Sequence, residues 1–132
     1  MGGMALGVPA MALRRALVHL HKAVLDWARR QHERQHGAVS SHQMLQLLLA
    51  HPQFAWVRPL SEIIVRLDEA LENDLVAHEA DYAVLLTELR SLICGAGGDT
   101  PFGEQYRAAM QDSPDVVLAH RDVVRILSPP QP

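Results

Sequence analysis

The chain is 132 residues long and 48% hydrophobic, which is enough for one domain with its own core. Its formal net charge of −3 argues against a dedicated nucleic-acid-binding protein, and no apolar run approaches the roughly 18 residues of a membrane-spanning helix. The single cysteine, Cys94, cannot form an internal disulfide, so we expect a soluble protein of the reducing cytoplasm.

The first predicted element is a long helix over residues 10–35, which ends before Gly37. Five apolar side chains recur along it at alternating steps of four and three, the spacing of a coiled-coil seam. They are Leu13, Leu17, Leu20, Val24 and Trp27. We expect this stripe to offer a surface for pairing with a second copy of the chain. Residues 1–9 are predicted to be a disordered leader, and the translation start could be Met1, Met4 or Met11.

A short helix is predicted over residues 41–50. Ser40 and Gln43 fit a capping box, in which the side chain of each residue bonds the backbone N–H of the other. The run MLQLLLA is apolar on nearly every side, so we expect this helix to be deeply buried.

Residues 52–58 follow as an aromatic connection. We expect Phe54 and Trp56 to cover one end of the core. The alternative is an exposed aromatic patch that binds a protein partner, although large exposed apolar patches are uncommon on monomers.

The most amphipathic stretch is a helix predicted over residues 59–73, which opens with Pro59 at the first helical position. Five large apolar side chains fall on one stripe of this helix, and the charged side chains fall mostly on the other side. The stripe comprises Leu60, Ile63, Ile64, Leu67 and Leu71. We expect it to pack against the neighbouring helices.

The rest of the chain predicts three more helices, over residues 79–94, 101–111 and 114–127. The last two begin with the same pattern, a capping residue followed by proline, at Thr100-Pro101 and Ser113-Pro114. Cys94 lies in an apolar helical run, which indicates a buried thiol.

The predicted fold is therefore all-α, because no segment reads as a β-hairpin or a β-α-β unit. We expect a single-domain helical bundle of about six helices over residues 10–127. The glycine-rich residues 95–100 are predicted to be a mobile linker, and residues 128–132 a disordered tail.

The most specific motif match is His32-Glu33-Arg34-Gln35-His36, which has the H-E-x-x-H pattern of zinc metalloproteases. Two histidines at i and i+4 face the same way on a helix and can share a metal ion, and Glu33 could activate a metal-bound water as a catalytic base. His42 lies at the spacing of a third ligand. The segment is very polar and no substrate-binding sheet is predicted. We therefore favour solvent-exposed histidines without a function over a zinc site or a zinc-dependent hydrolase.

Three further patterns carry less weight. The triplet His120-Arg121-Asp122 matches the H-R-D of kinases, but the rest of that signature is absent, and we expect His120 to be partly buried beside the core. His19 and His21 point in different directions on a helix and cannot share a metal ion. Glu69 and Glu72 share a helix face but lack the repeated Glu-x-x-His of di-iron bundles.

The first helix also has a basic face, made of Arg15, Lys22, Arg29 and Arg30. Residues 1–50 carry six basic and two acidic side chains, a balance of +4, and residues 51–132 carry six basic and thirteen acidic ones, a balance of −7. We expect this asymmetry to hold the first helix against the rest of the fold; docking of an acidic partner is the alternative. Nucleic-acid binding is not expected, because no aromatic residues are interleaved with the basic ones for base stacking.

The segment PQFAWVRPLSEIIVRLDEAL, residues 52–71, resembles a stretch found in short helical bacterial proteins without an assigned activity. The resemblance runs from about Leu20 to the last helix. It implies a helical bundle and carries over no functional residue. The large excess of arginine over lysine in the chain suggests a bacterial origin.

These observations together predict a non-enzymatic interaction or regulatory module without a cofactor, which binds a protein partner or a second copy of itself. The alternatives are a zinc-binding protein or zinc-dependent hydrolase that uses residues 32–36 with His42, and a protein that binds nucleic acid or an acidic partner through the basic face.

Overall fold

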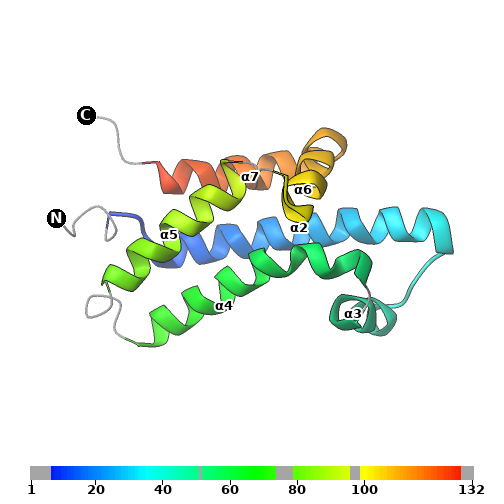
Figure 1. The fold of residues 1–132 in the computed structure, drawn as a ribbon, viewed down its shortest axis with the longest axis horizontal. Coiled ribbons are helices and arrows are strands. Elements are labelled where there is room, and N and C mark those ends of the chain that lie inside the picture. The colour runs from blue at the N-terminus through cyan, green and yellow to red at the C-terminus, as the bar shows by residue number, and fades with distance from the viewer. Residues whose placement is uncertain (1–6, 51, 74–78, 96–98, 129–132) are drawn as a thin grey trace.

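The computed structural model describes residues 7–50, 52–73, 79–95 and 99–128, and these form an all-α bundle without a strand, as predicted (Figure 1). Every predicted helix is present, with each end within one residue of the predicted bound. The elements are α2 (Ala10–His36), α3 (Ser41–Ala50), the 3-10 helix η1 (Pro52–Val57), α4 (Arg58–Glu72), α5 (Glu79–Ile93), α6 (Pro101–Asp112) and α7 (Pro114–Leu127).

The long helix α2 is the centre of the bundle, and it packs most extensively against α7 and α4 (Figure 1). Helix α5 packs against α4 and also contacts α6 and α7, so it closes the bundle on another side. The short helix α3 lies at one end of the molecule and packs mainly on η1. None of the described helices combines the length and the hydropathy that crossing a bilayer requires.

The seam of α2 forms the middle of the hydrophobic core. Leu13, Leu17, Leu20 and Val24 are fully buried, and they meet buried side chains of α4 and α7 such as Leu67. The expectation that this stripe is offered to a second copy is wrong, because the chain's own helices already cover it.

Local sequence signals set the helix ends. Gly37 ends α2 with a φ of 85°, a backbone conformation that glycine adopts without steric cost. The Ser40–Gln43 capping box is confirmed, with bonds of 2.9 and 3.1 Å between each side chain and the backbone N–H of the other residue. Thr100 and Ser113 cap α6 and α7 through their hydroxyl oxygens, which accept from Gly103 N and Val116 N.

Three predictions are corrected by the packing. Helix α3 is not deeply buried: Met44 is its one buried residue, while Leu45 and Leu49 are 53% and 72% exposed. The reason is its position at the end of the bundle, where it packs mainly on η1.

Cys94 is exposed and not buried. The buried stripe of α5 passes through Leu85, Leu86, Leu89 and Ile93, and the helix ends at Ile93, so the next residue falls outside the stripe.

The fold also begins earlier than predicted. Val8 was assigned to a disordered leader, but its side chain is buried and its carbonyl oxygen accepts a 2.8 Å hydrogen bond from the Tyr82 hydroxyl. The predictions for residues 1–6, for residues 96–98 of the linker and for the tail beyond Ser128 lie outside the described residues.

Candidate binding groove

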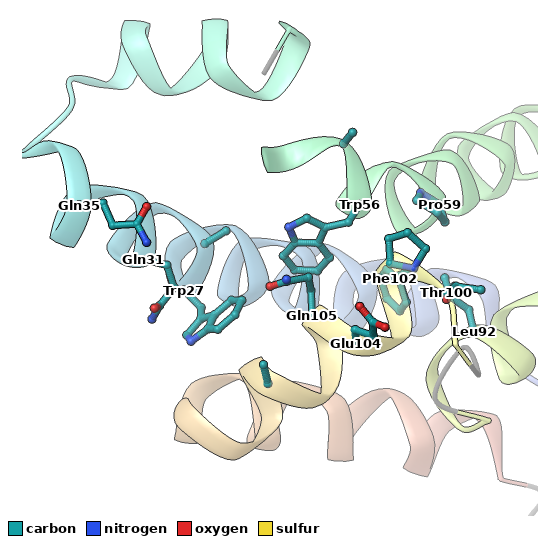
Figure 2. Close-up of a pocket in the computed structure, with 14 residues that line it drawn as sticks. Trp27, Gln31, Gln35, Trp56, Pro59, Leu92, Thr100, Phe102, Glu104 and Gln105 are labelled. Atoms are coloured by element: carbon teal, nitrogen blue, oxygen red, sulfur yellow. The ribbon is translucent and has the colours of Figure 1, made fainter. Parts of the chain in front are cut away.

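An open groove of about 890 Å³ lies between the C-terminal half of α2, the junction of η1 with α4, and α6 (Figure 2). This volume falls in the range of ligand-binding clefts. Its lining residues are Trp27, Ala28, Gln31, Gln35, Ala55, Trp56, Pro59, Leu92, Thr100, Pro101, Phe102, Glu104, Gln105 and Ala108.

The floor of the groove is aromatic, with one ring each from α2, η1 and α6 (Figure 2). The rings of Trp27 and Trp56 meet edge to face, with centroids 6.2 Å apart and planes at 77°. The ring centroid of Phe102 lies 6.1 Å from that of Trp56, and the Phe102 ring stacks on the ring of Tyr106. Trp27 and Phe102 are buried and Trp56 is half-buried, so packing fixes the floor before any ligand arrives.

The walls are elongated, and each includes an alanine. On α2 the lining runs from Trp27 to Gln35, about 12 Å along the helix axis, and on α6 from Pro101 to Ala108, about 10 Å. Ala28, Ala55 and Ala108 leave room between the walls, which lets another backbone approach closely.

The rim carries amides and one charge. Gln31, Gln35 and Gln105 supply groups that both donate and accept hydrogen bonds. Among the described lining residues, Glu104 is the one with a formal charge. The groove is therefore suited to an apolar ligand with few charges.

Asp112 ties the two walls together. It lies at the end of α6, and its Oδ2 accepts from the Trp27 indole N–H at 2.8 Å and from the Gln31 side-chain amide at 3.2 Å. These two hydrogen bonds join residues that are 85 and 81 positions apart in the sequence, and they hold the ring of Trp27 against α6.

The H-E-x-x-H segment has a structural role. Glu33 Oε2 accepts from the backbone N–H of Val39 at 2.9 Å and from Arg29 Nε at 3.4 Å, so it holds the segment that connects α2 to α3. The bond from Val39 is the largest cause of a lowered pKa of the Glu33 carboxyl, and Arg29 adds to it.

The histidines of that motif do not form a three-ligand cluster. His32 is 7% exposed, with its ring centroid 4.5 Å from that of His36 and 5.7 Å from that of Phe54. The expectation of solvated histidines is therefore wrong for His32, because η1 covers it. Among the described residues no three His, Cys, Asp or Glu side chains are placed to hold a metal ion, so His42 does not join the other two.

The basic face of α2 is only partly available. Arg15 and Arg30 are exposed, and Lys22 pairs with Asp26 at 3.5 Å. Arg29 donates to the carbonyl oxygen of Val39 as well as to Glu33, which makes it part of the α2–α3 connection.

Two other histidines are half-buried. His120 Nδ1 lies 2.6 Å from the Tyr106 hydroxyl, which confirms the expected place of His120 beside the core. His21 Nε2 lies 2.7 Å from Ser61 Oγ on α4, and burial lowers the pKa of both imidazoles.

Of the expected partner-binding aromatics, Trp56 lines the groove, while Phe54 is 2% exposed and belongs to the core. The α6 wall, with Phe102, Gln105 and Ala108, was not anticipated, because the meeting of α2 and α6 depends on packing between distant segments. The pair Gln31 and Gln35, two amides at i and i+4, was the one signal in the sequence for the rim.

Comparisons of the chain with protein-family models, with curated proteins and with solved structures found no match. The resemblance to short helical bacterial proteins therefore stays a prediction.

Proposed function

We propose that this chain is a non-enzymatic protein-interaction module, and that it binds a short apolar helical segment of a partner protein in the groove between α2 and α6. The observation that carries the proposal is the groove itself, an elongated opening of about 890 Å³ with an aromatic floor and alanine in its walls.

The dimensions favour a helix as the ligand. A segment of two to three turns is about 11–16 Å long, which matches the length of the α2 wall. Such a helix presents apolar anchors at i, i+3 or i+4, and i+7, which can pack on the aromatic floor of the groove. The alanines allow its backbone to come close, and the glutamine amides bond its polar edge.

The charges define the partner segment further. The lining offers an apolar floor and neutral amides, and its charge is the carboxylate of Glu104 at the α6 wall. We therefore expect a segment with an uncharged contact face and a lysine or arginine at the edge that faces Glu104.

Tryptophan fluorescence can report on the groove directly, because both tryptophans of the chain line it. A displayed library of peptides of about 12 residues, selected on the intact chain, supplies the probes. We expect enriched peptides to have apolar residues at helical spacing and to change the tryptophan emission on titration.

The variant Ala108→Glu places a charged side chain in the groove at an exposed helical position. It should weaken peptide binding about tenfold or more. Ala83→Glu makes the same change at an exposed position of α5 away from the groove and should bind as the wild type does. A selection without enriched helical peptides, or peptides that bind Ala108→Glu as tightly as the wild type, would overturn the proposal.

A further inference from the structure

Asp112, the last residue of α6, lies beside the groove and bonds two of the residues that line it. Its Oδ2 accepts from the Trp27 indole N–H at 2.8 Å and from the Gln31 side-chain nitrogen at 3.2 Å. Asp112 is exposed and does not itself line the groove. Among the described residues no Lys, Arg or His forms an ion pair with it. Within the described part of the chain, the partners of this carboxylate are therefore the two N–H donors.

A carboxylate can only accept hydrogen bonds, and this decides how the Gln31 amide is oriented. A glutamine amide has donors on Nε2 and an acceptor at Oε1, so it can turn either end toward a neighbour. Beside a group that only accepts, one orientation alone makes a bond: Nε2 faces Asp112, and Oε1 points the other way across the planar amide. The indole N–H of Trp27 is likewise used by Asp112, so the Trp27 ring offers the groove apolar contact.

The other two rim amides are not held in this way. Gln35 and Gln105 also line the groove, but neither side chain makes a hydrogen bond to another described residue (Figure 2). Each can turn to present its oxygen or its nitrogen to a ligand. Gln31 is thus the one amide among the described lining residues whose hydrogen-bonding polarity is set before a ligand arrives.

We propose that Asp112 determines a specificity of the groove: it positions Gln31 so that the carbonyl oxygen meets the bound segment, and the partner must donate a hydrogen bond at that point. The group required is an N–H donor on the polar edge of the partner helix, such as the amide of glutamine or the ammonium of lysine. This inference rests on the proposed function, because it concerns the segment that occupies the same groove. Asp112 acts through Gln31 and is therefore a positioning residue.

The polarity of Gln31 matters because a wrong partner group is left unpaired. A donor placed against the Gln31 oxygen forms a hydrogen bond, whereas an acceptor there meets another acceptor and loses the bond that it made with water. A carboxylate on the partner is also repelled by the negative charges of Asp112 and Glu104. Hydrogen bonding and charge act in the same direction, so the experiment must separate them.

Glutamine and glutamate offer a donor and an acceptor of nearly the same shape. Each polar position of a peptide selected on the intact chain is made glutamine and then glutamate, and tryptophan emission gives both dissociation constants. At the position that meets Gln31, the glutamate peptide should bind the wild type about tenfold more weakly than the glutamine peptide. Gln31→Met removes the amide and should reduce this ratio. Gln105→Met, the matched control on the other wall, should leave it unchanged.

Variants of Asp112 test whether it orients Gln31. Asp112→Asn keeps an oxygen that can accept from both donors but has no charge, so the ratio should stay above about fivefold. Asp112→Ala removes the oxygen, so Gln31 can turn its nitrogen toward a glutamate, and the ratio should fall to about twofold. Asp122→Asn removes the same charge at an exposed position of α7 outside the groove lining, and the ratio should not change.

Two results with the Asp112 variants contradict the proposal. If Asp112→Asn and Asp112→Ala lower the ratio equally, charge alone produced it. If Asp112→Ala weakens both peptides by the same factor, Asp112 only supports the walls. Partial unfolding does not alter the ratio, because both peptides meet the same folded fraction. Should Asp112→Ala not fold at all, Asp112→Leu replaces it, since leucine keeps the branched shape and also lacks an oxygen.

The same experiment distinguishes this inference from the proposed function. Peptides that bind in the groove without a ratio that depends on Gln31 overturn the inference alone. A selection without any enriched peptide removes the proposed function and the inference with it.

Discussion

Tyr106 and His120 form a part-buried polar side-chain pair beside the core, with the phenol oxygen 2.6 Å from Nδ1. Burial raises the pKa of the Tyr106 phenol, and a negative charge on nearby Cys94 would raise it further. Burial also lowers the pKa of the His120 imidazole. Both groups are therefore neutral near pH 7, and we assign the hydroxyl proton of Tyr106 as the donor to Nδ1.

This pair makes the stability of the fold dependent on pH. The folded-state pKa of His120 lies below the ordinary 6.5. Its contribution to the unfolding free energy is therefore complete above pH 6.5 and is lost as the pH falls toward the folded-state pKa. Protonation also removes the acceptor at Nδ1. His120→Asn keeps an acceptor near that position but does not titrate. Between about pH 7.5 and about pH 5, this variant should lose less unfolding free energy than the wild type.

Urea denaturation at the two pH values measures the difference. Tyr106→Phe should cost about 0.5–1.5 kcal/mol at the higher pH through the lost hydrogen bond, and less at the lower pH. His21 is half-buried too and keeps titrating in His120→Asn, so part of the pH dependence remains. The control is His19→Asn at an exposed position, which should behave as the wild type does. Identical pH dependence in the wild type and His120→Asn would contradict the assigned bond.

At the scale of the helices, two of the hydroxyl caps, those of Ser113 and Ser40, differ in what depends on them. Ser113 is buried and caps α7 at its junction with α6, whereas Ser40 caps α3 at the end of the molecule. Ser113→Ala should therefore lower the global unfolding free energy by about 1 kcal/mol. Ser40→Ala should change it by less than about 0.5 kcal/mol, because α3 opens locally at little cost to the rest.

Hydrogen exchange distinguishes the local event from the global one. In Ser40→Ala the amides of α3 should exchange faster than in the wild type, while those of α2 and α7 are unchanged. In Ser113→Ala the protected amides of α2 and α7 should all lose protection together. If Ser40→Ala lowers the protection of α2 as well, α3 is part of the cooperative core.

The helix ends were predictable because their signals are local. Gly37, Thr100-Pro101 and Ser113-Pro114 act within a few residues of themselves, and the structure uses each of them. The burial of α3 was not predictable from its composition. An apolar helix is buried only if other elements surround it, and this depends on where the 37–40 connection and η1 place it.

The groove could be predicted from the sequence only in part. Trp27 was expected on the apolar stripe of the first helix, and both Trp27 and Phe102 are buried. That they face the same opening depends on the bond from Trp27 to Asp112, across 85 residues of sequence. A single sequence contains no local signal for such a contact.

For the whole molecule, surface ion pairs link neighbouring helices. Arg14 of the basic first helix pairs with Asp68 of α4. Arg66 of α4 pairs with Glu88 of α5, and both of these residues belong to the acidic remainder of the chain. These pairs are partly exposed, so each contributes little to stability. The charge asymmetry therefore adds little to the folding free energy, and the buried apolar side chains supply most of it.

The largest stability effects should accordingly follow burial and not residue type, and two leucines provide a matched test. Leu17 lies in the middle of α2 and is fully buried, so Leu17→Ala removes its packing and leaves a cavity at a cost of about 2–5 kcal/mol. Leu49→Ala, at an exposed position, should change the unfolding free energy by no more than about 0.5 kcal/mol. Urea denaturation of the wild type and of both variants measures the two costs. A cost of several kcal/mol for Leu49→Ala would mean that the outer face of α3 packs against the bundle. A small cost for Leu17→Ala would mean that α2 is not the centre of the bundle.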